Sequence, residues 1–260
     1  MRFKLTIEYA GTRYSGWQIQ KNARTVQGEL HRAVREATGG NDFELYGAGR
    51  TDAGVHALAQ VAHLDIDTTL GGEPLRRRIN DVLPSDINIL RADRVRRTFH
   101  ARHDAVGRSY IYQISRRRTA FAKSFVWWVK DELDVERMRA AARRFVGFHD
   151  FQSFSDDEPG EKSTQVLVDV LEIHEDGDLV VLHVEGSHFL WKMVRRVVGV
   201  LVEIGRGALS EEQAASMLLE RSDAPARLTA PSSGLFLERV YYEGDRRDLP
   251  ISAPISVHCF

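Results

Sequence analysis

The spacing of apolar residues predicts a series of strands and helices in the first hundred residues. Every second residue from Phe3 to Tyr9 is apolar, which is the pattern of a strand with one buried face. Residues 25–38 predict a helix, because apolar residues recur three and four positions apart between a possible N-cap at Thr25 and a Gly-Gly pair. The same patterns predict strands at 43–47, 58–66 and 87–93 and a helix from Pro74 to Val82.

The rest of the chain continues this mixture of strands and helices. Predicted elements are a strand at 108–115, a helix at 134–146, a hairpin of strands at 164–174 and 178–185, helices at 188–204 and 210–220, and a strand after Gly234. The amphipathic strands favour an α+β fold with mainly antiparallel sheets over a doubly wound parallel sheet. With a boundary near 100–107, we expect two domains, 1–105 and 106–260, and a mobile acidic loop at 155–163.

Composition limits the class of protein without identifying it. The chain has 260 residues and a formal net charge of −1, which favours no particular partner. No apolar run approaches the ~20 residues of a membrane span, and the alternating N-terminus is a strand pattern, not a signal peptide. Cys259 is the only cysteine, so no intrachain disulfide forms and a cytoplasmic location is expected.

The type and grouping of the basic residues suggest a polyanionic partner. Arginine supplies 30 of the 36 basic residues. The arginines form clusters at 76–78, 94–97, 116–118, 143–144 and 195–196. The planar guanidinium suits phosphate oxygens and stacks on bases, so a neutral chain with segregated charge can bind nucleic acid. The alternative is that these charges coat solvated faces.

The most informative run is GAGRTDAGVHA at residues 47–57. Its glycines (Gly47, Gly49 and Gly54) allow tight turns and a close approach by a ligand. Asp52 follows Arg50 by two positions, and a carboxylate beside a guanidinium stays ionised at neutral pH. Such a group acts as a nucleophile or a base. The alternative is an ordinary turn in which Asp52 bonds its own backbone.

Cofactor chemistry is not expected from this run. His56 and Asp52 resemble half of a metal site, but no further ligands stand near them at suitable spacing. The run also lacks the spacing of the phosphate-binding glycine loops. The sequence therefore predicts neither a metal nor a small-molecule cofactor.

Seven blocks of sequence, in order, resemble the tRNA pseudouridine synthases of the A type. They are YAGTRYSGWQIQ (9–20), TVQGEL (25–30), GAGRTDAGVHA (47–57), FHAR (99–102), RSYIYQI (108–114), FLWKMVRRVVG (189–199) and APSSGLFL (230–237). The resemblance implies two α+β halves whose sheets join around a central cleft. It also implies conversion of uridine to pseudouridine at positions 38, 39 and 40 of the tRNA anticodon stem-loop, by a homodimer without cofactors.

The resemblance also implies roles for four residues. Asp52 is the essential catalytic aspartate, and Arg195 keeps it ionised and aimed. Tyr110 stacks on the flipped uracil, and its hydroxyl is a candidate for proton transfer. Arg50 holds the extruded nucleotide. Without the resemblance, Arg195 reads as a surface charge on a helix and Tyr110 as a core residue of a strand.

Two other functions remain as alternatives at this stage. One is a catalytically silent RNA-binding protein on the same scaffold. The other is a glycosidase or nucleoside hydrolase that uses Asp52, but this chemistry requires a second carboxylate and the sequence offers no strong candidate.

Overall fold

The computed structural model describes residues 1–40, 42–157, 163–248 and 250–257, and it divides the chain into two compact units. Unit 1 comprises Met1–Val106 and Phe236–Arg247, and unit 2 comprises Gly107–Leu235 and Asp248–Phe260. The first change of unit lies within two residues of the boundary expected at 105. The last strand, however, returns to unit 1 instead of staying with the expected domain 106–260. Cys259 lies outside the described residues.

Unit 1 is built on strand β1 (Arg2–Tyr9), which pairs antiparallel with both β3 (His56–Ile66) and β4 (Ile87–Val95). Strand β2 (Phe43–Gly47) pairs antiparallel with β3 on its other side. Strand β10 (Leu235–Tyr242) pairs with β3 in parallel, through Phe236 and Leu237. This parallel pairing explains why the end of the chain belongs to unit 1.

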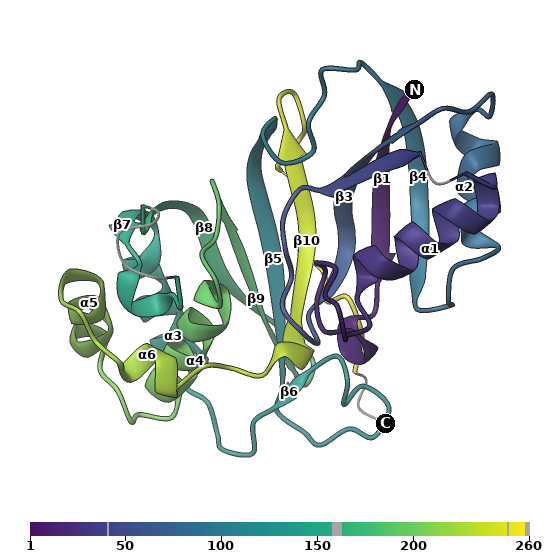
Figure 1. The fold of residues 1–260 in the computed structure, drawn as a ribbon. Helices are drawn as coiled ribbons and strands as arrows, with labels where there is room; N and C mark the ends of the chain where they lie inside the picture. Colours follow the sequence, from purple (N-terminus) through teal and green to yellow (C-terminus); the bar gives the residue numbers. More distant parts are fainter. Residues whose placement is uncertain (41, 158–162, 249, 258–260) are drawn as a thin grey trace. The chain divides into compact units, whose positions relative to one another are not determined.

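Helices α1 (Val26–Thr38) and α2 (Gly72–Asn80) lie on one face of this sheet (Figure 1). The Thr25 hydroxyl accepts a hydrogen bond from the Gly28 amide, and Gly39 ends α1 in the left-handed conformation with a φ of 70°. The cap and the stop that the sequence predicted are therefore confirmed. The helix buries its apolar stripe completely, at Val26, Leu30, Ala33 and Val34.

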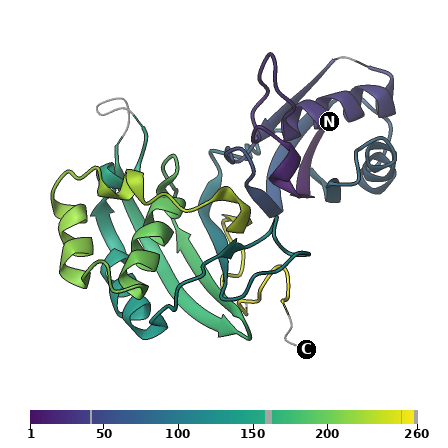
Figure 2. The ribbon, with the colours of Figure 1, turned by 90° about the horizontal axis from the view of Figure 1, so that it is seen from below.

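In unit 2, β5 (Ala105–Ser115) pairs antiparallel with β9 (Leu179–Gly186), and β9 pairs antiparallel with β8 (Gln165–Asp176). Strand β7 (Gly147–Asp150) continues the sheet beyond β8, and the short β6 (Trp127–Trp128) pairs with β5 in parallel. The remaining elements are helices α3 (Val135–Ala142), α4 (Met193–Gly205), α5 (Glu211–Leu219) and α6 (Ala224–Arg227). These helices lie on one face of the sheet (Figure 2).

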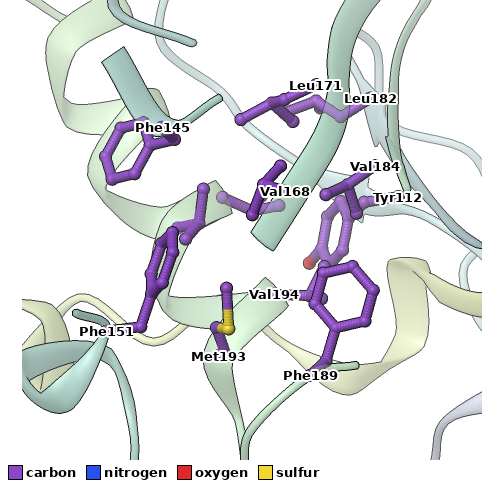
Figure 3. A pocket seen from close by; sticks show the side chains of 12 residues that line it. Tyr112, Phe145, Phe151, Val168, Leu171, Leu182, Val184, Phe189, Met193 and Val194 are labelled. Atoms are coloured by element: carbon purple, nitrogen blue, oxygen red, sulfur yellow. The ribbon is translucent and has the colours of Figure 1, made fainter. Parts of the chain in front are cut away.

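Helix α4 is buried along most of its length and contributes to the core of unit 2. Its valines pack against β8 and β9 around a narrow pocket whose walls are almost entirely apolar (Figure 3). Only Tyr112 contributes a polar atom from its side chain to this lining. The pocket is therefore part of the interior of unit 2.

The sequence predicted an earlier start for this helix. The expected range was 188–204, but α4 begins at Met193 because Lys192 adopts a left-handed conformation with a φ of 63°. Of the described residues other than glycine, only Lys192 has a positive φ. Residues 188–192 therefore lie outside the helix, and Trp191 and Lys192 form the turn that leads into α4. The capping box of Ser210 and Gln213 is confirmed at the start of α5.

The predicted α+β class with mainly antiparallel pairing is confirmed in both units. Among the helices that the structure describes, none is long and apolar enough to cross a membrane.

Candidate active-site residues in the two units

Asp52 lies in unit 1, on the loop of residues 48–55 that joins β2 to β3. Its carbonyl oxygen accepts a hydrogen bond from the Val55 amide at 3.1 Å, and Gly54 has a φ of 79°. This is the tight turn that the glycine spacing predicted. Asp52 is half-buried and Arg50 is exposed, so the loop presents both side chains at its surface.

The backbone of the Asp52 loop is held by the segment 9–20. The Trp17 amide donates to the Thr51 carbonyl at 3.0 Å, and the Gly54 amide donates to the Tyr14 carbonyl at 3.2 Å. The Thr51 hydroxyl, which is buried, is hydrogen-bonded to the Tyr9 hydroxyl at 2.8 Å. These bonds fix the residues on both sides of Asp52.

Two glycines of segment 9–20 allow it to lie directly against the loop. A Cβ added at Gly11 would lie 1.9 Å from the Val55 carbonyl oxygen, and one added at Gly16 would lie 2.6 Å from the Thr51 carbonyl oxygen. Both distances are far below van der Waals contact, so only glycine fits. The block YAGTRYSGW contained this signal, but we did not assign these glycines a role from the sequence.

Gly47 and Gly49 of the loop itself differ in their surroundings. A Cβ at Gly47 would lie 2.6 Å from the indole of Trp17, so packing requires glycine there. A Cβ at Gly49 would meet no atom within 4 Å. Neither packing nor a positive φ therefore requires glycine at position 49. Open space beside Gly49 agrees with the expectation that a ligand can approach the loop there.

His56 has a structural position at the start of β3. Its side chain is 1% exposed, its Nδ1 accepts a hydrogen bond from the Gly11 amide at 3.0 Å, and its ring stacks on Phe236 with centroids 4.7 Å apart. Because Nδ1 is an acceptor, the neutral ring carries its proton on Nε2. No cluster of three metal-ligating side chains occurs among the described residues.

Tyr110 lies on β5 in unit 2, opposite Val184 of β9. It is half-buried, and its ring meets Phe189 edge-on with centroids 5.1 Å apart. Tyr112, two residues later, is 1% exposed and donates its hydroxyl to the Pro231 carbonyl at 2.8 Å. Tyr112 is therefore the core tyrosine of this strand, and Tyr110 is more accessible than Tyr112.

Arg195 lies in the first turn of α4, where it is held by the segment that precedes β10. Its Nε donates to the Ala230 carbonyl at 2.6 Å, and the Ala230 amide donates to the Arg195 carbonyl at 3.0 Å. The side chain is half-buried. This pair of bonds fixes the direction in which the guanidinium leaves the helix.

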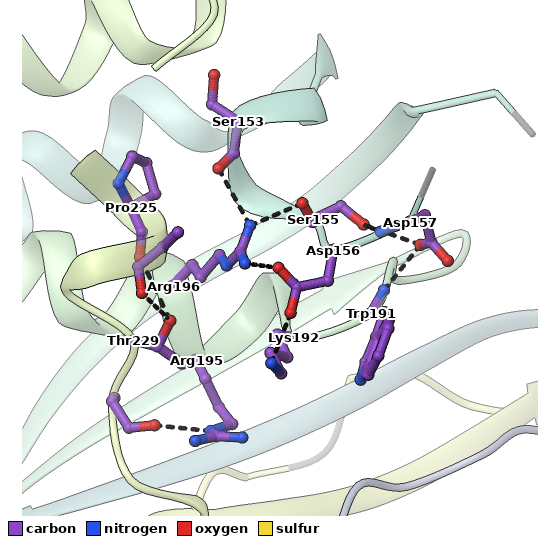
Figure 4. A network of polar contacts seen from close by, with 12 residues as sticks. Ser153, Ser155, Asp156, Asp157, Trp191, Lys192, Arg195, Arg196, Pro225 and Thr229 are labelled. Atoms are coloured by element: carbon purple, nitrogen blue, oxygen red, sulfur yellow. Dashed lines mark hydrogen bonds and ion pairs between the residues drawn. The ribbon is translucent and has the colours of Figure 1, made fainter. Parts of the chain in front are cut away.

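The neighbouring Arg196 is buried and anchors a network of charges (Figure 4). One terminal nitrogen donates to the Ser155 carbonyl at 2.7 Å and contacts the Ser153 carbonyl, while the other forms an ion pair with Asp156. Lys192 pairs with the same carboxylate at 2.5 Å. Burial lowers the pKa of Arg196 from its ordinary value, so these partners stabilise a charge that is shielded from water.

This network fastens the segment 153–157 to the turn before α4. The Asp157 carboxylate accepts from the Trp191 amide at 3.0 Å, and the Asp156 amide donates to the Trp191 carbonyl. Residues 155–157 of the loop that was expected to be mobile therefore form hydrogen bonds and an ion pair, and 158–162 lie outside the described residues. Sequence reasoning missed Arg196, although the adjacent Arg-Arg pair in an apolar helix was a possible signal.

Several of the arginine clusters are partly neutralised by carboxylates. Arg76 and Arg77 both pair with Glu73 at 2.8 Å, and together they lower the pKa of Glu73 to about 2. In unit 2, Arg116 pairs with Glu175 at 2.6 Å and Arg117 with Asp178 at 2.8 Å. Clustering in the sequence therefore overstates the positive charge at these sites.

The four residues with expected roles fall into two groups. Asp52 and Arg50 belong to unit 1, and Tyr110 and Arg195 belong to unit 2. The ion pair between Asp52 and Arg195 stays a prediction.

Comparison with known proteins identifies the class of enzyme to which these residues belong. A family model described as tRNA pseudouridine synthase matches residues 5–104 and 141–243. This match covers most of both units. The matched ranges contain Arg50, Asp52 and Arg195, whereas Tyr110 lies between them.

Curated relatives match over nearly the whole chain. The tRNA pseudouridine synthase A of Nitrobacter winogradskyi is 44% identical over 94% of this chain and 96% of its own length. The tRNA pseudouridine synthase A 2 of Clostridium tetani is 38% identical over 92% of this chain and 98% of its own length. The chain belongs to the tRNA pseudouridine synthase family, and it is therefore an isomerase.

Proposed function

We propose that this protein converts uridine to pseudouridine in tRNA, at positions 38, 39 and 40 of the anticodon stem-loop. The observation that carries the proposal is Asp52, half-buried on a loop whose backbone is fixed on both sides of the carboxylate. A catalytic group must be held in place before the substrate arrives, because misplacement greatly slows a reaction. The hydrogen bonds and close contacts of segment 9–20 meet this requirement.

The reaction breaks the bond between C1′ of the ribose and N1 of uracil, turns the base, and joins C5 to C1′. No atom is gained or lost apart from a proton that moves from C5 to the solvent and one that returns to N1. Asp52 acts either as a nucleophile on the nucleoside or as a base that helps to release uracil. Both routes require the ionised carboxylate.

The other three residues have supporting roles in this proposal. Arg195 carries the positive charge that keeps Asp52 ionised, and its bond to the Ala230 carbonyl limits the directions that its guanidinium can take. Tyr110 offers an accessible ring for stacking on the flipped base. Arg50, exposed beside Asp52, binds a phosphate of the extruded nucleotide.

The substrate must be opened before the reaction begins. Stem nucleotides are paired and stacked, and flipping one of them costs a few kcal/mol. Phosphate contacts from basic side chains supply this energy. We also propose that the protein is a homodimer that acts in the cytoplasm, as the family resemblance and the single cysteine predict.

Mapping pseudouridine at each uridine of a tRNA transcript tests the proposal. We expect the intact protein to modify positions 38–40, and Asp52→Asn to react at least about a thousandfold more slowly, because an amide is neither nucleophile nor base here. Affinity for tRNA should be largely kept. Asp42→Asn, an exposed carboxylate ten residues earlier, is the matched control and should react normally.

Two results would contradict the proposal in different ways. Normal pseudouridine yield from Asp52→Asn would remove Asp52 from the chemistry. Binding of tRNA without any pseudouridine from the intact protein would indicate the catalytically silent RNA-binding alternative.

A further inference from the structure

The segment 118–130, which contains most of the loop between β5 and β6, strand β6 and the residues after it, exposes aromatic and basic side chains. Phe121 is 98% exposed and Trp128 is 41% exposed. Arg118, Lys123 and Lys130 are also exposed in the same stretch. We call these five exposed side chains, which are close together in the sequence, the 118–130 face.

The backbone of this loop is well anchored. The Gln113 side chain donates to the Phe125 carbonyl at 3.0 Å, and the Ser233 hydroxyl donates to the Val126 carbonyl at 3.2 Å. Ala122 and Val126 are buried in an apolar cluster. That cluster also contains Ile111, Leu179, Val181 and Val257. The exposure of Phe121 is therefore a property of an anchored loop and not of a frayed one.

In the part of the chain that the structure describes, no carboxylate forms an ion pair with Arg118, Lys123 or Lys130. This distinguishes Arg118 from Arg116 and Arg117 of the same cluster, each of which is paired. The Arg118 guanidinium instead lies 5.7 Å from the centroid of the Trp128 ring. A guanidinium on an aromatic ring keeps its hydrogen-bond donors available at its edge.

We propose that the 118–130 face binds tRNA, by stacking an unpaired base on Phe121 and holding the adjacent phosphates with Arg118 and Lys123. Exposed aromatic rings between basic side chains form the usual platform for single-stranded nucleic acid. A second copy of this chain is the competing occupant, but the cores of protein interfaces are depleted in lysine. The inference rests on the proposed function, because it takes tRNA as the ligand.

The test measures binding of a labelled tRNA transcript to the full chain at several salt concentrations. We expect Phe121→Ala to raise the Kd about tenfold and Phe121→Tyr to restore it, because tyrosine also stacks. The matched control is Leu219→Ala, since Leu219 is an apolar residue of unit 2 that is 85% exposed. It should bind tRNA normally.

The contribution of the charged side chains of the face is measured by the salt dependence of tRNA binding. Lys123→Gln should reduce the slope of log Kd against log salt by about 0.7 to 0.9, the contribution of one phosphate contact. Arg137→Gln, an exposed charge on α3, should leave the slope unchanged. Thermal melting of each variant confirms that it is folded.

Light scattering and pseudouridine mapping on the same samples distinguish the outcomes. An unchanged Kd for Phe121→Ala overturns the inference. If Phe121→Ala also has a lower molecular mass than the parent chain while it keeps its affinity for tRNA, the face is assigned to contact between copies of the chain. If the intact chain forms pseudouridine in either case, the proposed function stands without this face. If the intact chain forms none, the proposed function fails, whatever the Kd values are.

Discussion

The Asp52 loop and the turn that carries Arg195 are both held firmly, but by different kinds of interaction. The Asp52 loop is fixed by backbone hydrogen bonds to segment 9–20 and by glycines that let two backbones touch. The Arg195 turn is fixed by charges, in which Asp156 joins Lys192 and the buried Arg196. The Asp52 loop depends on glycines that lack a side chain, and the Arg195 turn depends on the charged side chains of Asp156, Lys192 and Arg196.

This difference has consequences for how each region fails. Uncharged backbone contacts respond little to salt or pH, and they are broken by added volume. A partly buried ion network tolerates neighbouring changes in size but is destabilised when one partner is removed, because a charge is then left without compensation.

The largest effect is expected from Gly11→Ala. The added methyl group would overlap the Val55 carbonyl, which is backbone and cannot rotate away. We expect unit 1 to lose about 3 kcal/mol of stability and pseudouridine formation to fall with it. Gly49→Ala, where the added methyl group meets no atom, is the control in the loop itself and should unfold like the parent chain. Equal denaturation midpoints for both variants would refute the close-contact argument.

Asp156→Ala should have the next largest effect. It leaves the buried guanidinium of Arg196 and the ammonium of Lys192 without their shared carboxylate, at a cost of about 2 kcal/mol. Asp157→Asn is the control, because an amide oxygen still accepts from the Trp191 amide. Denaturant titration compares the three chains. If Asp156→Ala were as stable as Asp157→Asn, the network would not be what holds the turn.

A dependence of stability on pH is expected in unit 1, from His63. Burial, aided by the positive charge of Arg2, lowers the pKa of His63 to about 4. The folded chain therefore favours neutral His63, and this stability is present above the ordinary pKa of about 6.5 and is lost as the pH falls from there toward 4.

Melting curves between pH 7 and pH 4 test this dependence. His63→Asn keeps an acceptor for the Ala101 amide, which bonds Nδ1 of His63 at 3.1 Å, but it does not titrate. Its melting temperature should fall less with acidification than that of the parent chain, by a few degrees. Parallel curves would show that His63 is not the responsible group.

The smallest effect is expected from a comparison of the two tyrosines on β5. Tyr112→Phe removes the bond to the Pro231 carbonyl and should cost about 1 kcal/mol. For Tyr110→Phe, the rate of pseudouridine formation separates two roles of the side chain. Retained activity would mean that stacking alone matters, and a collapse would implicate the hydroxyl. A larger stability loss for Tyr110→Phe than for Tyr112→Phe would reverse the assignment of the core tyrosine.

Local patterns predicted most of the fold. Alternation gave β1 and β5, and the spacing of apolar residues with a Thr cap and a glycine stop gave α1 to within one residue. The start of α4 was predicted five residues too early, because Phe189 and Met193 fit one helical face although the backbone turns at Lys192. A periodicity of side chains does not report a single residue in the left-handed conformation.

The candidate site was predicted less completely than the fold. The glycine run identified the turn at Asp52, and family blocks pointed to Tyr110 and Arg195. The glycines that fit segment 9–20 against the loop were missed, since each lies against a carbonyl far away in the chain. The parallel pairing of β10 with β3 was missed for the same reason.

The sequence by itself determined the local elements and the chemical groups that the chain offers, because propensity, capping and side-chain type act over a few residues. Tertiary structure decided which groups are accessible. It buried Tyr112 and Arg196 while leaving their neighbours Tyr110 and Arg195 half-exposed, and it paired Arg116 and Arg117 while leaving Arg118 on the surface. Such choices depend on residues distant in the chain that share one core, which no local pattern encodes.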